Sequence, residues 1–285
     1  MLKAGQYEVY ILETGRFALD AGVVFGLIPK ALWSKKIETD SKNRMEMALR
    51  SILIKSDDRK ILVETGAGNL LGDKMRQIYK VDYTNYSLEK ALQNIGLDFE
   101  DITDVINTHL HFDHCGGNVI RENGQIQPAF PNATYYVQKD HYNWVQSPSI
   151  LDRNSFLPLN YKSLYDDGLL KLIDGPEEIF PGIELLISNG HTPGQQHVLI
   201  NDDQQPVFFC ADLFPLHYNV KTTWISSLEL FPVDFVKEKK EIVQKAWEGN
   251  WRVIYPHDPK VKISRIKKLG AKYKAFEPNL DSPFN

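Results

Sequence analysis

The sequence predicts an α+β fold, in which β-sheets are covered by helices within a single domain spanning residues 1–285. Strand-like apolar runs outnumber helical patterns in both halves of the chain, and the helical patterns are spread among the strands. No stretch rich in Pro, Gly and Ser separates the two halves, so nothing in the sequence marks a boundary between domains.

In the first half, apolar and alternating runs predict strands at 7–12, 47–55 and 60–64, with Asp57 and Asp58 as the turn between the last two. Helical spacing follows at 72–79 and at 87–95, where Gly96 is a suitable C-terminal stop. A short apolar strand at 104–107 leads into His109. Residues 20–33 are apolar and punctuated by glycine but follow neither period, which fits a core-packing loop or a pocket wall.

The second half repeats this mixture. Helical patterns occur at 139–145, 155–165 and 234–247, and the last is the strongest because its apolar residues fall on one face. The predicted strands of this half are 134–137, 169–173, 183–188, 197–200, 207–211 and 251–255.

Composition excludes several classes of protein. Hydrophobic residues make up 42% and charged residues 25% of the 285 residues, as in ordinary globular proteins. The net charge of −4 disfavours a nucleic-acid partner. No run of 18 apolar residues and no signal-peptide pattern is present, and two cysteines cannot build a disulfide framework. We therefore expect a cytoplasmic protein that binds neither nucleic acid nor membranes.

The most informative motif is His109-Leu110-His111-Phe112-Asp113-His114, followed by Cys115 and two glycines. Four potential metal ligands lie within six residues, directly after a predicted strand. Imidazole and carboxylate groups suit zinc, and also iron, manganese or cobalt. One tetrahedral ion cannot easily take four ligands from so short a turn, whereas two ions could share them. A polar loop of hydrogen-bonded histidines is the alternative.

Three further candidate ligands each follow a predicted strand: His191, Asp212 and His257. Ligands at corresponding ends of several strands can meet at one edge of a sheet. Taken singly, each could equally be a capping residue or a polar residue of the core. Together with the first motif they favour a metal site.

On these residues the chain resembles the metallo-β-lactamase-fold hydrolases, from the run 61–66 through the His/Asp motif to His257. The resemblance implies a four-layer αββα sandwich with the site at one edge of the sheets. It also implies two divalent metal ions, zinc in the first instance. One would be held by His109, His111 and His191, the other by Asp113, His114 and His257, with Asp212 bridging them.

Two acidic residues have further expected roles. Asp113 lies inside the cluster and is a candidate to orient the attacking water and carry its proton. Glu64 stands before Thr65 and Gly66, where many members of the family carry Asp. The resemblance implies that this acid orients a metal-binding histidine from behind. A simple acid at a strand end is the alternative.

Within the family the chain is most similar to the quorum-quenching N-acyl-homoserine lactonases and their methyl-parathion-hydrolase-like relatives. The similarity rests on 25–30 with 32–33, on 211–215 with His217, and on Trp224 with 231–232. Their apolar and aromatic content suits a pocket for a neutral acyl substrate. Core packing is the alternative for each predicted pocket residue, namely Val24, Phe25, Phe214, His217 and Trp224.

The expected activity is hydrolysis of a lactone or ester, with N-acyl-homoserine lactone as the first candidate. Phosphotriester hydrolysis and a glyoxalase II-like thioester hydrolysis are the enzymatic alternatives. The short basic tail, 260–276, disfavours the thioester class, whose members usually add a helical C-terminal region. A module that kept the fold without its metals is disfavoured because no expected ligand is replaced. Lactonases of this kind often form homodimers.

Overall fold

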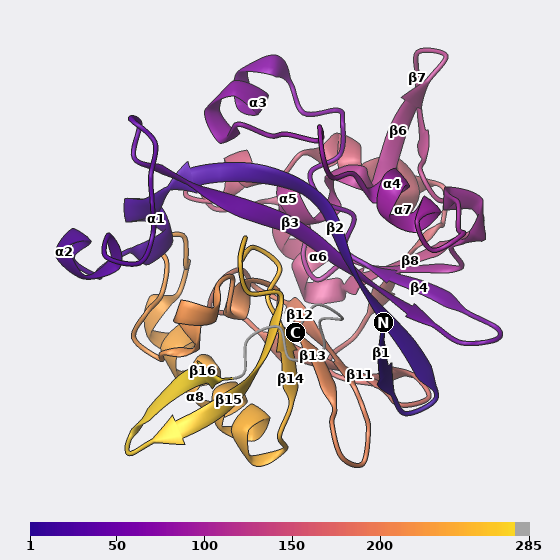
Figure 1. Cartoon of the computed structure of the whole chain (residues 1–285). Helices are drawn as coiled ribbons and strands as arrows, with labels where there is room; N and C mark the ends of the chain where they lie inside the picture. Colours follow the sequence, from indigo (N-terminus) through magenta and orange to yellow (C-terminus); the bar gives the residue numbers. More distant parts are fainter. Residues whose placement is uncertain (277–285) are drawn as a thin grey trace.

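The computed structural model describes residues 1–276 and places two seven-stranded sheets face to face (Figure 1). The first sheet has the strand order β1 (Leu2–Ala4), β2 (Tyr7–Asp20), β3 (Arg44–Lys55), β4 (Lys60–Val63), β5 (Asp104–Ile106), β8 (Thr134–Gln138) and β9 (Leu170–Ile173). The second has the order β10 (Glu178–Phe180), β11 (Ile183–Ser188), β12 (Gln195–Ile200), β13 (Val207–Phe209), β14 (Arg252–Ile254), β15 (Ile263–Leu269) and β16 (Lys272–Phe276).

The remaining elements cover or connect the sheets. A small hairpin consists of β6 (Val119–Glu122) and β7 (Gln125–Pro128). The α-helices are α1 (Ala21–Phe25), α2 (Lys30–Trp33), α3 (Asp73–Tyr79), α4 (Leu88–Gln93), α5 (Phe112–Cys115), α6 (Lys139–Gln146), α7 (Lys162–Asp166) and α8 (Pro232–Glu248). Short 3-10 turns are η1 (Phe99–Asp101), η2 (Gly116–Asn118), η3 (Arg153–Ser155), η4 (Pro158–Asn160), η5 (Ala211–Leu213) and η6 (His217–Val220).

Neighbouring residues of the central strands pack into different apolar layers. In β4, Ile61 and Val63 face the second sheet, whereas Leu62 packs on the opposite side with helices α4, α6 and α7. In β13, Phe209 faces the first sheet and Phe208 packs against α8. Because side chains alternate along a strand, both faces of each sheet are covered. The predicted four-layer αββα sandwich is confirmed.

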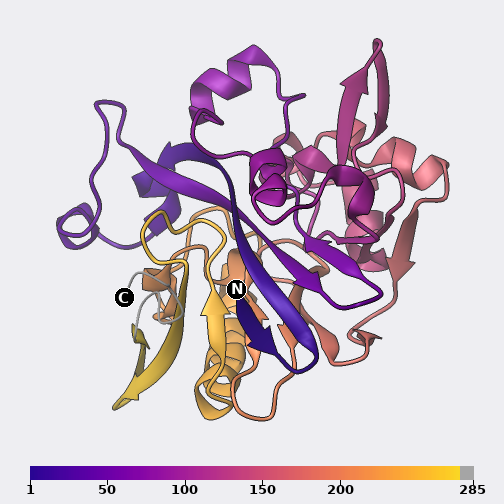
Figure 2. The same cartoon turned by 45° about the vertical axis from the view of Figure 1, so that its right-hand side comes forward.

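Several elements differ from the sequence prediction. The strand predicted at 7–12 continues to Asp20 as β2 and pairs with β3 along a curved ribbon that both views show, with a bulge between Glu13 and Gly15 (Figures 1 and 2). The helix predicted at 155–165 is interrupted: Pro158 begins the turn η4, and α7 starts only at Lys162. Residues 20–33 form α1 and α2, and the tail forms the hairpin β15–β16.

The topology brings the ends of several strands to one edge. β4, β5 and β8 are parallel neighbours, and so are β13 and β14 in the second sheet. Glu64 follows β4 and His109 lies just beyond β5, while Asp212 and His257 lie just beyond β13 and β14. In the described part of the chain, no helix combines the length and the apolar character that a membrane span requires.

Candidate metal centre

The His/Asp motif is held in a tight turn by glycine-dependent packing. His111 precedes the single helical turn α5, which contains Asp113 and His114, and the backbone N–H of His114 donates to the carbonyl of His111 at 3.1 Å. The loop after β4 packs directly on this turn, since a Cβ on Gly68 would lie 2.0 Å from the carbonyl oxygen of Gly116. Only residues without a side chain allow this approach.

The structure brings all seven predicted ligands together. One group is formed by His109, His111, His191 and Asp212 and another by Asp113, His114 and His257; within each, the candidate ligand atoms lie within 4.8 Å of one another.

Asp212 lies between the two groups. Its Oδ2 is 3.3 Å from Nε2 of His191 and 3.4 Å from Nε2 of His114. Its Oδ1 is 3.0 Å from Nε2 of His257. The position of Asp212 suits a bridging carboxylate, as the family resemblance implies.

The outer ring nitrogen, Nδ1, of His114, His191 and His257 lies close to an oxygen atom in each case. Nδ1 of His114 lies 2.8 Å from Glu64 Oε1, at ion-pair distance but without hydrogen-bond geometry. Nδ1 of His191 faces Glu229 Oε2 at 2.8 Å, and Nδ1 of His257 lies 2.9 Å from the carbonyl oxygen of Ala48. The acceptors beside His191 and His257 favour a proton on Nδ1, so that Nε2 of these two rings can present a lone pair to a metal.

The Nδ1 atom of His109 also lies beside an oxygen atom, which belongs to the hydroxyl of Thr108. The Oγ1 of Thr108 donates to Glu64 Oε1 at 2.7 Å, so it can accept the proton on Nδ1 of His109 at 3.0 Å. His111 is turned the other way, with Nδ1 only 3.0 Å from Nε2 of His109 and 3.2 Å from Nε2 of His191.

Several inward ring nitrogens lie close to one another. Nε2 of His114 and Nε2 of His257, for example, are 3.1 Å apart. Imidazole nitrogens grouped in this way are the donors that a metal centre requires. The donor set therefore fits divalent ions.

Burial and neighbouring charges adjust the ionisation of the cluster in both directions. Burial alone would lower the pKa of His114 and of His191, but the carboxylates of Glu64 and Asp212 beside His114, and of Glu229 beside His191, outweigh it and raise both. Burial and the adjacent imidazoles lower the pKa of His109 and of His111 well below the usual range, which favours the neutral, ligating form. Burial alone would raise the pKa of Asp212, but the nearby imidazoles of His114 and His257 outweigh it and hold that pKa well below its usual value. A neutral imidazole and an ionised carboxylate are the forms that bind metal.

Three supporting residues were not predicted from the sequence. Glu229, Ala48 through its carbonyl, and His141 contribute from outside the ligand set. His141 accepts the N–H of Leu110 at 2.8 Å through Nε2 and faces the carbonyl of Pro193 at 2.8 Å through Nδ1, so it links two ligand loops. An isolated Glu, a backbone carbonyl and a lone His carry no recognisable spacing, so only the folded structure reveals them.

A cavity of about 100 Å³ opens on the cluster. Its apolar wall comes from β2, β3 and the segments beside them, and its hydroxyl groups come from Tyr79, Ser155 and Ser226. The lining residues are Phe17, Leu19, Val24, Met47, Tyr79, His111, Phe112, Asp113, Ser155, His191, Asp212, Pro215, Ser226, Leu228, Glu229 and His257.

Of the five predicted pocket residues, Val24 lines this cavity and the other four lie behind or beside it. Phe25 is fully buried between Trp33 and Trp224, with ring centroids 5.5 and 5.7 Å away, and Phe214 belongs to the core beneath α8. His217 pairs with the carboxylate of Asp258. The aromatic residues thus pack on one another, which corrects their expected role as pocket lining.

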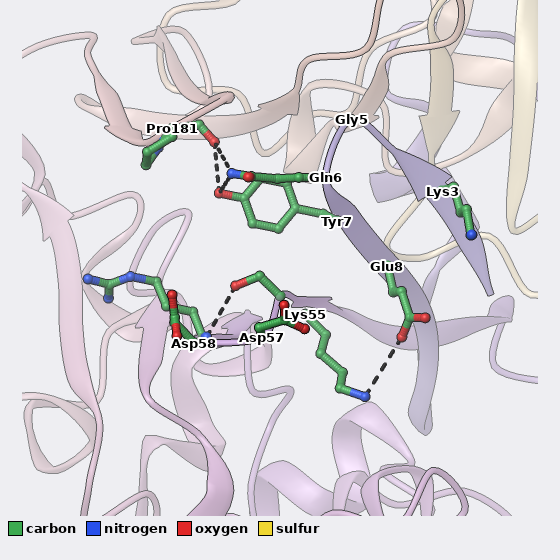
Figure 3. A pocket seen from close by; sticks show the side chains of 11 residues that line it. Lys3, Gly5, Gln6, Tyr7, Glu8, Lys55, Asp57, Asp58 and Pro181 are labelled. Carbon is green, nitrogen blue, oxygen red and sulfur yellow. Dashed lines mark hydrogen bonds and ion pairs between the residues drawn. The ribbon is translucent and has the colours of Figure 1, made fainter.

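A larger hollow of about 650 Å³ lies elsewhere, between the β1–β2 turn, the β3–β4 turn and Pro181 (Figure 3). Its polar side chains bind one another: the Tyr7 hydroxyl and the Gln6 amide both donate to the carbonyl of Pro181, and Lys55 lies 3.8 Å from Glu8. The turn at 56–59 precedes β4, whereas Glu64 follows it, so this hollow is at the end of the strand away from the cluster.

Comparison with known proteins places the chain in a family. The sequence profile described as the metallo-beta-lactamase superfamily matches residues 50–271. The chain belongs to the metallo-beta-lactamase superfamily. This membership confirms the predicted hydrolase class, and with the His/Asp cluster it supports a site for divalent metal.

Similar members of the superfamily include lactonases. An N-acyl homoserine lactonase from Bacillus sp is 37% identical over 217 residues, covering 72% of this chain and 75% of that protein. A crystal structure of a probable metal-dependent hydrolase from Staphylococcus aureus is 25% identical, with a TM-score of 0.86 over 97% of this chain and 99% of the other. AidC, a dizinc quorum-quenching lactonase, shares the fold at 22% identity, with a TM-score of 0.75 over 96% and 95% of the two chains.

Proposed function

We propose that this protein hydrolyses N-acyl-homoserine lactones with two zinc ions. The observation that carries the proposal is the convergence of imidazole nitrogens from three separate segments on Asp212. The lactonases among its similar relatives support the choice of substrate, because they come from the same superfamily and one is 37% identical.

The proposed division of ligands follows the two geometric groups. One ion would be held by His109, His111 and His191 and the other by Asp113, His114 and His257, with Asp212 shared. Bound zinc would supply Lewis acidity for the ester carbonyl and would lower the pKa of a water molecule at the site. Iron, manganese or cobalt would suit the same donors.

Asp113 is the residue we propose to move the proton. Its Oδ2 lies 3.6 Å from Nε2 of His114 and 3.8 Å from Nε2 of His257, and its side chain also lines the cavity. From there the carboxylate can accept a proton from the attacking water and return it to the alkoxide that leaves when the lactone ring opens. Cys115 and Cys210 are fully buried, and burial raises the pKa of both thiols, so neither is suited to act as a nucleophile.

The cavity suits a neutral acyl compound. Phe17, Leu19, Val24 and Met47 form an apolar surface for a chain, and the hydroxyl of Ser226 lies among the polar groups available to an amide. A phosphotriester or a thioester would use the same metals and is therefore an outcome of the test below.

The test measures metal content and hydrolysis together. Purified protein should retain close to two ions per chain and should release protons from N-hexanoyl-homoserine lactone faster than it cleaves an aryl phosphotriester or a thioester. Asp212→Asn should lose metal and activity, whereas the matched variant Asp166→Asn, at an exposed side chain paired with Lys162, should keep both. A metal-free wild-type protein under metal-replete conditions would refute the proposal.

We further propose that residues 1–285 form one domain and that the protein is a cytoplasmic homodimer. The free, buried thiols of Cys115 and Cys210 support a reducing compartment. Exposed apolar side chains such as Leu27, at 88% exposure, and Leu151, at 79%, support self-association. Light scattering during size-exclusion chromatography measures the oligomeric state, and a monomeric mass would reject the dimer.

A further inference from the structure

Lys239 of helix α8 is a fully buried lysine outside the metal site. Its side chain lies over the rings of Phe214 and Phe235, with Nζ 5.8 and 5.6 Å from their centroids. Nζ donates one hydrogen bond, to the carbonyl of Trp224 at 2.6 Å. An ammonium group placed among aromatic rings with a single hydrogen-bond acceptor is costly, so its position calls for a physical explanation.

The acceptor carbonyl belongs to the segment that supports His191. We call residues 221–231 the Glu229 loop. Trp224 is one anchor of this loop, and its carbonyl also accepts the side-chain amide of Asn219 at 3.0 Å. Further along, the N–H of Ser226 donates to Glu229 Oε1 at 3.2 Å, while Glu229 Oε2 faces Nδ1 of His191. The hydrogen bond from Lys239 therefore fixes the start of a short path that ends on a metal ligand.

Helix α8 also holds the backbone on the other side of His191. The carboxylate of Glu238 accepts the N–H groups of Asn189 and Gly190, each at 2.9 Å. Gly190 lies directly against the helix, since a Cβ there would be 2.3 Å from the Cα of Phe235. The N-terminal half of α8 thus contacts both segments that position the imidazole of His191, namely residues 189–190 and the Glu229 loop.

Charge connects the same groups. Glu229 is itself buried, with its carboxylate beside His191, and its charge acts on the ammonium of Lys239 in the favourable direction. A buried carboxylate is stabilised by a positive charge near it.

We propose that Lys239 is a positioning residue for the metal ligand His191, acting through the Glu229 loop. The inference rests on the proposed metal-dependent function and goes beyond it, because it assigns a role to a lysine that touches neither metal ligands nor the cavity lining. Removing the ammonium should release Glu229 from its fixed position and weaken metal binding, although the fold remains.

The experiment compares zinc retention against a graded chelator in Lys239→Met and in Lys240→Met, an exposed lysine next along the same helix. Methionine fills the apolar surroundings, so circular dichroism should stay near that of wild type and the melting temperature of the metal-free protein should not fall. Zinc affinity should fall about 10- to 100-fold in Lys239→Met, as for other supporting groups around metal ligands, and stay unchanged in Lys240→Met. Lys239→Arg, which restores a donor and a charge, should recover part of the loss.

A double-mutant cycle with Glu229→Gln separates positioning from a general packing defect. If Lys239 acts through Glu229, the double variant should lose no more than about threefold beyond the larger single effect. Fully multiplied effects, or an unchanged zinc affinity in Lys239→Met, would overturn the inference while leaving the proposed function intact. Wild-type protein that retains no zinc would overturn both.

Should Lys239→Met not fold, Asn219→Ala tests the same anchor, because it removes the other donor to the Trp224 carbonyl. That variant should also release zinc more readily than wild type. Retention equal to wild type would then contradict the role of this anchor.

Discussion

The substitution Glu64→Asp tests the role of Glu64, which stands where many members of the family carry the shorter Asp. Glu64 is 2% exposed, and Oε1 serves both Nδ1 of His114, at 2.8 Å, and the hydroxyl of Thr108, at 2.7 Å. Losing one methylene draws the carboxylate back by about 1.5 Å, so both contacts open to about 4 Å, beyond hydrogen-bonding range.

The backbone at Glu64 cannot easily move toward His114 to restore these contacts, because hydrogen bonds hold it in place. The N–H of Glu64 donates to the carbonyl of Ile106 at 3.0 Å, and the N–H of Thr65 donates to the carbonyl of His114 at 2.8 Å. Both groups of ligands should therefore bind metal more weakly, because His114 loses its contact with Glu64 directly and His109 loses its support through Thr108. Zinc affinity should fall about 10- to 100-fold, which corresponds to about 1.4 to 2.7 kcal/mol.

The assay is competition for zinc with a chelator of known affinity, followed by the rate of lactone opening at saturating zinc. Glu64→Gln keeps the length but removes the charge, so we expect the affinity order wild type, Glu64→Gln, Glu64→Asp. Glu177→Asp, at an exposed position, is the control and should equal wild type. Wild-type affinity in Glu64→Asp, or a reversed order of the two variants, would refute the reasoning.

Three other outcomes are expected. Gly190→Ala should destabilise the protein by about 1–3 kcal/mol in urea unfolding, because its Cβ would meet the backbone of α8 at 2.3 Å, whereas Gly72→Ala meets nothing within 4 Å and should not. Arg50→Met should cost about 3–5 kcal/mol, because it removes a buried guanidinium that pairs with Glu13 at 2.8 Å and donates to the carbonyl of Asp258 at 2.8 Å; a loss below 1 kcal/mol would contradict this. Burial lowers the pKa of Lys239 from 10.5 to about 7, so the unfolded chain binds the extra proton between these values. Stability should therefore rise with pH from about 7 to about 10, and a Lys239→Met variant that keeps this rise would contradict the assignment.

The sequence predicted the parts of the site that have a pattern. The spacing of His109 to His114 and the strand-end positions of His191, Asp212 and His257 pointed to the seven residues that the structure brings together. By contrast, Glu229 and the carbonyl of Ala48 reach their histidines through tertiary packing alone, so no local spacing marks them.

Apolar composition was a weaker guide than ligand spacing. An aromatic residue looks the same in a sequence whether it lines a cavity or fills a core, and Phe25 and Phe214 fill cores. The true lining residues Phe17 and Leu19 lie two positions apart on the extension of β2 beyond residue 12, so a longer predicted strand would have placed them on one face.

The division of ligands between the sheets has a mechanical consequence. His109 and His111 follow a strand of the first sheet and His191 a strand of the second, and the other group likewise joins His114 to His257. Each bound ion would therefore act as a further cross-link between two layers that already meet through apolar contacts and through hydrogen bonds such as that from Arg50 to the carbonyl of Asp258. Without its metal the protein would then have sheets that separate more readily at this edge, so that metal supply would govern its resistance to proteases as well as its turnover.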